Sequence, residues 1–195
     1  MNINEAKALI NEEAIEHLKK VITNEEKIDT STKLNGDAIM IAFCDAINNG
    51  IIKPSSLSEM TIKMLNSSTQ SISQSKLGEI LDYVHQNQPH IICEIKLIPV
   101  DGNIPIQAWR FESSKDCKFN EIFEFVVTEF KITPSMVREQ LSKLLKPTIA
   151  NNIGQFVAKY QSSTHKNELV VSITTIARLA NMCGYKIICE FRNEK

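Results

Sequence analysis

The stretch from Ser172 to Asn193 constrains the fold more than any other part of this 195-residue chain. Ser172 is typical of a helix N-cap, and the apolar residues after it recur at the three-and-four spacing of one helix face. Gly184 follows, and glycine most easily takes the left-handed conformation that ends a helix. From Tyr185 onward apolar and polar side chains alternate, which is the period of a half-buried strand. We therefore expect a capped helix, a glycine stop and a closing strand over residues 185–192.

A β-hairpin is expected in the middle of the chain. Residues 91–98 are apolar and β-branched, Asp101-Gly102 is a strong hairpin-turn signal, and residues 104–111 supply the returning strand. Together with residues 185–192, this hairpin predicts a small three-stranded antiparallel sheet.

The tetrad Ile-Ile-Cys-Glu occurs twice, at residues 91–94 and at residues 187–190. Each copy follows a helical pattern, which raises the hypothesis of a degenerate internal duplication covering roughly residues 36–98 and 119–193. In that case the two strands that contain the tetrads would pair about a pseudo-twofold axis. Chance repetition among β-branched strands is the alternative, because the spacings upstream of the two tetrads differ.

Helical periodicity covers most of the remaining sequence, and we expect six or seven helices. The fold class is therefore α+β and mainly helical. An amphipathic helix over residues 4–23 and a polar linker form an N-terminal segment, residues 1–35. A helical unit that ends in the hairpin spans residues 36–112, and a helix-turn-helix-like unit that ends in a strand spans residues 119–195. A charged connector separates these two units.

Composition excludes several classes of protein. Hydrophobic residues make up 43% of the chain and charged residues 23%, as in an ordinary soluble domain. No apolar run approaches the ~20 residues that a membrane helix needs, and the N-terminus is too polar for a signal peptide. The five cysteines form no C-x-x-C pair, which favours reduced thiols and a cytoplasmic location.

The net charge of −1 conceals an asymmetry between the two ends of the chain. Residues 1–117 carry 11 basic and 16 acidic side chains, whereas residues 118–195 carry 11 basic and 7 acidic side chains. The C-terminal part is therefore the better candidate for contact with a phosphate backbone, which needs local positive charge.

Residues 172–192 resemble the C-terminal end of lambda-repressor-like (XRE-type) helix-turn-helix regulators and antitoxins. The residues that match are Thr175, Ile176, Leu179, Ala180 and Gly184, followed by 186–191. This resemblance implies that a helix-turn-helix lies upstream, across residues 132–160, with Ile132-Thr133-Pro134 at the entry of its first helix. The spacing from Thr133 to Ile176 is longer than in the family.

The resemblance implies that Thr148 to Tyr160 is a recognition helix and that double-stranded DNA is the partner. The polar face of this helix would present Asn151, Asn152, Gln155 and Lys159. Asn and Gln can pair bidentately with adenine edges in the major groove. Lys143 and Lys146 would contact phosphates. An ordinary solvent-facing helix side is the alternative interpretation of the same residues.

A protein-binding adaptor, chaperone, antitoxin or immunity protein is the competing class. Trp109, Arg110 and Phe111 would be natural anchors if partly exposed, because tryptophan and arginine are enriched at interface hot spots. A second copy of the chain is a further candidate partner. Charge geometry would discriminate the two classes, since DNA binding requires the three lysines named above to lie on one open face.

No pattern in the sequence indicates catalysis. His85 and His90 are five residues apart without a cysteine or carboxylate at ligand spacing, so they are expected to be surface histidines. The six glycines are too scattered for a phosphate-binding loop. We expect a non-enzymatic protein without a metal or other cofactor.

Overall fold

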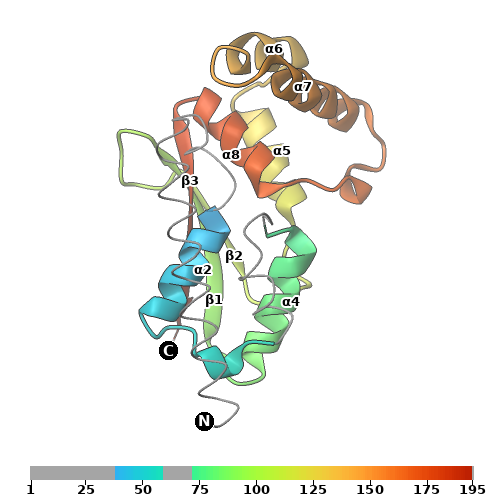
Figure 1. Cartoon of the computed structure of the whole chain (residues 1–195). Helices are drawn as coiled ribbons and strands as arrows, with labels where there is room; N and C mark the ends of the chain where they lie inside the picture. The colour runs from blue at the N-terminus through green and yellow to red at the C-terminus, as the bar shows by residue number, and fades with distance from the viewer. Residues whose placement is uncertain (1–37, 59–71, 195) are drawn as a thin grey trace.

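A three-stranded antiparallel sheet lies at the centre of the computed structural model, which describes residues 38–58 and 72–194 (Figure 1). The strands are β1 (Ile91–Pro99), β2 (Gln107–Phe111) and β3 (Tyr185–Asn193), in the order β2-β1-β3. Six α-helices accompany the sheet within the described residues, so the expected mainly helical α+β fold is confirmed. The helix expected over residues 4–23, the linker after it and most of the helix expected from Pro54 lie outside the described residues.

Sequence signals for helix ends are found where the helices begin and end. The helices are α2 (Ala38–Asn48), α4 (Gln74–His85), α5 (Phe119–Glu129), α6 (Pro134–Leu141), α7 (Pro147–Ser162) and α8 (Ile173–Met182), with short 3-10 helices η2 (Pro54–Ser56) and η3 (Lys166–Glu168). Ser73, Thr133 and Ser172 each cap a helix by accepting a hydrogen bond from the backbone N–H three residues later. Gly184 follows α8 with φ of 81°, the left-handed conformation expected of it.

The helices cover one face of the sheet and bury it. On that face of β1 four side chains are 0% exposed: Ile91, Cys93, Ile95 and Leu97. Phe43 of α2 lies 5.4 Å from Phe191 between ring centroids, and Phe119 of α5 lies 6.4 Å from Phe111. Residues from both sides of the connector at 113–118 therefore belong to one hydrophobic cluster, and the two units distinguished in the sequence share a single core.

The two Ile-Ile-Cys-Glu tetrads lie in the neighbouring strands β1 and β3 and meet at their last residues. The antiparallel register places Glu94 opposite Glu190, and the strands run in opposite directions from this pair, with Cys93 opposite Phe191 and Ile95 opposite Cys189. The Sγ atoms of Cys93 and Cys189, the cysteines of the two tetrads, are 3.3 Å apart in the core. The expected pairing about a local twofold axis is thus present, and the internal duplication stays a hypothesis that this pairing supports.

The opposite face of the β1–β3 pair carries charges that compensate one another. Two carboxylates directly across an antiparallel pair repel each other. Lys96 contacts both, with its Nζ 3.1 Å from Glu94 Oε2 and an ion pair to Glu190, and Arg192 Nη2 lies 3.2 Å from Glu94 Oε1. The hydrogen bond to Glu190 raises the pKa of Lys96. Cross-strand ion pairs thus offset the repulsion between Glu94 and Glu190.

Strand β2 is shorter than the sequence predicted. The expected strand covered residues 104–111, but pairing with β1 includes only residues 107–111. Ile104 is 81% exposed, and Pro105 has no N–H to donate to a neighbouring strand. The turn predicted at Asp101-Gly102 is present, with Gly102 N donating to the carbonyl oxygen of Pro99 at 3.0 Å, but the connection to β2 continues beyond it through residues 103–106.

Buried thiols make the stability of this core dependent on pH. Burial, and then the negative charges of Asp116 and Asp82, raise the pKa of the Cys117 thiol from 9.0 to about 12. An unfolded thiol ionises at lower pH, so the unfolded state binds fewer protons and the free energy of unfolding falls as pH rises above about 9. Urea denaturation at about pH 7.5 and pH 10 measures this loss. In Cys117→Ala the drop should be smaller, and an equal drop in both proteins would contradict this role for Cys117.

Candidate nucleic-acid interface

Helices α6 and α7 form a helical hairpin at one end of the molecule, above α5 and α8 (Figure 1). Thr133 caps α6 and Pro134 occupies its first turn, which is the entry predicted from the sequence. A short turn over residues 142–146 leads into α7, where Pro147 again occupies the first turn. The hairpin is thus defined by short-range signals and presents α7 at the surface.

A close helix–helix contact explains the glycine in the middle of α7. Gly154 is buried, and a Cβ atom placed there would lie 2.9 Å from Arg138 Cγ and 3.1 Å from the carbonyl oxygen of Pro134. A side chain at position 154 would therefore push α6 away from α7. Glycine costs about 1 kcal/mol relative to alanine inside a helix, and this contact accounts for its presence.

The polar face of α7 is open to solvent, as the sequence predicted. Ala150, Ile153, Val157 and Tyr160 point into the core. The exposed side carries the predicted Asn151, Asn152, Gln155 and Lys159. Residues 151, 155 and 159 follow one another at a spacing of four and form a continuous stripe.

Positive charge gathers on the same hairpin. Residues 134–162 contain four basic side chains and one acidic side chain, Glu139. Lys143 lies in the turn, 68% exposed, with its Nζ 3.8 Å from Glu139 Oε1. Lys146 is exposed at the N-cap position of α7. Because the helix rises 1.5 Å per residue, Lys146 and Lys159 lie roughly 20 Å apart along the axis, at opposite ends of α7.

The predicted partner-binding residues are placed less favourably. Phe111 is 3% exposed and packs on Phe119, so its proposed role as an exposed anchor is wrong. The alternation of β2 turns Trp109 to the same side, where its ring lies 5.4 Å from that of Phe125. Arg110 points outward and forms ion pairs with Glu112 and Glu194.

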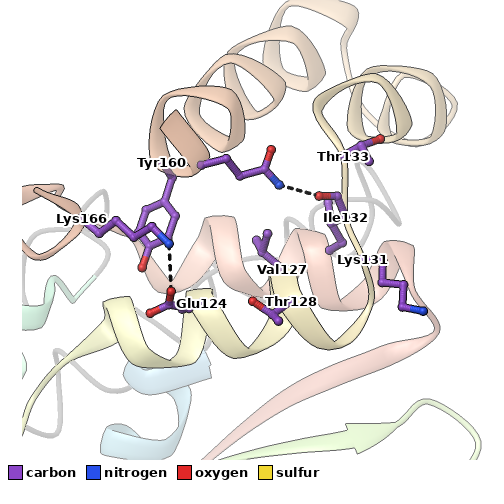
Figure 2. A pocket seen from close by; sticks show the side chains of 9 residues that line it. Glu124, Val127, Thr128, Lys131, Ile132, Thr133, Tyr160 and Lys166 are labelled. Carbon is purple, nitrogen blue, oxygen red and sulfur yellow. Dashed lines mark hydrogen bonds and ion pairs between the residues drawn. The ribbon is translucent and has the colours of Figure 1, made fainter. Parts of the chain in front are cut away.

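Sequence reasoning missed one hollow at the surface, between α5 and the C-terminal end of α7 (Figure 2). Its walls come from α5, the α5–α6 connection, α7 and η3. None of these segments carries a recognisable ligand motif. Only the folded chain brings them together.

No protein-family model, curated protein or solved structure matches the chain. Among the described residues, no helix is long and apolar enough to span a membrane.

Proposed function

We propose that this chain is a non-enzymatic, cytoplasmic DNA-binding transcriptional regulator of the helix-turn-helix type, with α7 as its recognition helix. The observation that carries the proposal is the exposed stripe of Asn151, Gln155 and Lys159 on a helix whose other side is fixed in the core. A recognition helix needs this combination, because it must enter the major groove without losing its own packing.

The amides and the lysines of α7 suit different parts of a DNA duplex. The amides of Asn151, Asn152 and Gln155 match the donor and acceptor pattern of adenine edges. Lysines at both ends of the helix suit the phosphates that border the groove. The basic hairpin therefore provides electrostatic attraction, and its amides provide discrimination between sequences.

Replacement of Lys143 and Lys146 by alanine is expected to weaken DNA binding and its dependence on salt. Each phosphate contact contributes about −0.9 to the slope of log K against log salt. The slope of the double variant should therefore be less negative by about 2. Fluorescence anisotropy with a labelled duplex from upstream of the protein's own gene, over a salt series, measures both quantities.

A matched double variant controls for net charge. Lys53 and Lys115 are exposed and lie outside the α6–α7 hairpin, so Lys53→Ala/Lys115→Ala should leave the slope unchanged. Equal losses in the two variants would show that binding depends on overall charge and would exclude the proposed surface. Absence of binding by the unmodified protein at low salt would end the DNA-binding proposal.

The adaptor class has weaker support. One anchor is buried, and Arg110 is already paired with two carboxylates. The outer edge of β2, which has no neighbouring strand among the described residues, is the feature that still suits a protein partner.

A further inference from the structure

The hollow between α5 and α7 has the dimensions of a site for a small molecule. Its volume is about 270 Å³, close to the lower end of the range for ligand pockets. Three buried side chains form its floor: Val127, Ile132 and Tyr160. The floor offers the apolar contact that a flat organic group needs.

Most polar groups around the floor are already paired. Lys166 Nζ lies 3.0 Å from Glu124 Oε1 and 5.3 Å from the centroid of the Tyr160 ring. Gln161 Nε2 donates to the carbonyl oxygen of Ile132 at 2.9 Å. These contacts fix the side chains at one end of the cavity and leave that end without net charge (Figure 2).

Lys131 lies at the opposite end of the cavity from Lys166 (Figure 2). Figure 2 shows the Lys131 side chain turned outward at the rim of the cavity, and its ammonium group has no ion-pair partner among the described residues. Thr128 also lines the cavity, and its side chain forms no hydrogen bond within that part of the chain. With Glu124 paired to Lys166, the lining has a formal charge of +1. A ligand that complements it carries a single negative charge.

The backbone at Lys131 is also unusual. Its φ is 49°, and it is the single non-glycine residue with positive φ in the described chain. Hydrogen bonds from Lys131 N to Thr128 O and from Ile132 N to Val127 O form the motif that usually ends a helix with glycine. A lysine in this conformation is unfavourable for the fold, and such residues cluster at functional sites.

We propose that this cavity binds a small monocarboxylate with a flat apolar body. The exposed Lys131 side chain rotates inward to pair with the ligand carboxylate, which also accepts a hydrogen bond from Thr128, and the apolar body of the ligand lies on the floor beside Tyr160. A phosphate group suits the site less well, because it carries more charge than one lysine offsets. The site shares no residue with the proposed DNA surface, so loss of either activity leaves the other testable.

Benzoate is a suitable probe, with benzamide and benzylamine as neutral and cationic analogues of similar shape. Titration followed by NMR should shift the methyl signals of Val127 and Ile132, with a dissociation constant on the order of 1 mM for so small a ligand. Benzamide should bind at least about fivefold more weakly, because it cannot pair with Lys131. Equal binding of the three probes, or shifts confined to other residues, would overturn the proposal.

Lys131→Gly separates ligand recognition from folding. Glycine suits the left-handed conformation better than lysine, so this variant should be at least as stable as the original protein. It should nevertheless lose the preference for benzoate over benzamide, whereas Lys115→Ala should keep it. Retention of the preference in Lys131→Gly would show that this lysine does not bind the carboxylate.

Discussion

Phe123→Ala should lower the free energy of unfolding by about 3–5 kcal/mol, because truncation of a fully buried aromatic side chain leaves a cavity. Phe123 is 0% exposed in α5, with its ring centroid 4.6 Å from that of Tyr160 and 5.4 Å from that of Phe156. Both partners belong to α7, so this side chain anchors the proposed recognition helix to the core. Chemical denaturation followed by circular dichroism measures the change.

Phe125→Ala is the matched control on the same helix. Phe125 is partly buried and packs against Trp109 of β2, so its truncation should cost less than that of Phe123. If the two variants were equally stable, the tight packing between α5 and α7 would not be a main support of the fold.

Local signals in the sequence were sufficient to predict most of the secondary structure. The cap at Ser172, the stop at Gly184 and the strand after it act between neighbouring residues, and the structure contains all three. Strand β2 was predicted too long because alternation continues through residues 104–106. The alternation of apolar and polar residues carries no information about backbone donors, and Pro105 has no N–H to donate to a neighbouring strand.

Gly154 shows why tertiary packing remains hidden in a single sequence. Its low helix propensity counts against a helix across residues 147–162, yet the helix is continuous there. The reason is the approach of Arg138 and the Pro134 carbonyl, which belong to another helix. The burial of Phe111 likewise depends on α5, which covers that side of β2.

The candidate sites differ in how far the sequence could reveal them. The polar stripe of α7 lies on one helix, so periodicity predicted its exposed residues. The cavity joins Val127, Lys131, Tyr160 and Lys166 from separate segments, and no spacing along the chain connects them. Its one local signal is a lysine where glycine usually ends a helix, and this signal emerges only once the end of α5 is known.

Asn151→Ala/Asn152→Ala/Gln155→Ala should abolish discrimination between DNA sequences while leaving non-specific binding almost intact. A bidentate contact between an amide and a base is worth about 1–3 kcal/mol of discrimination, so the triple variant should bind its own upstream duplex at least about tenfold more weakly. All three side chains are exposed, so the fold should be preserved. Gln86→Ala/Asn87→Ala, which removes two exposed amides at the end of α4, is the control.

The most direct test of the central claim is the ratio of affinities for the upstream duplex and a scrambled duplex, measured by anisotropy at one salt concentration. The original protein and the α4 control should show a ratio well above one. The triple variant should give a ratio near one with unchanged affinity for the scrambled duplex. A triple variant that keeps the original ratio would show that α7 does not read the DNA sequence.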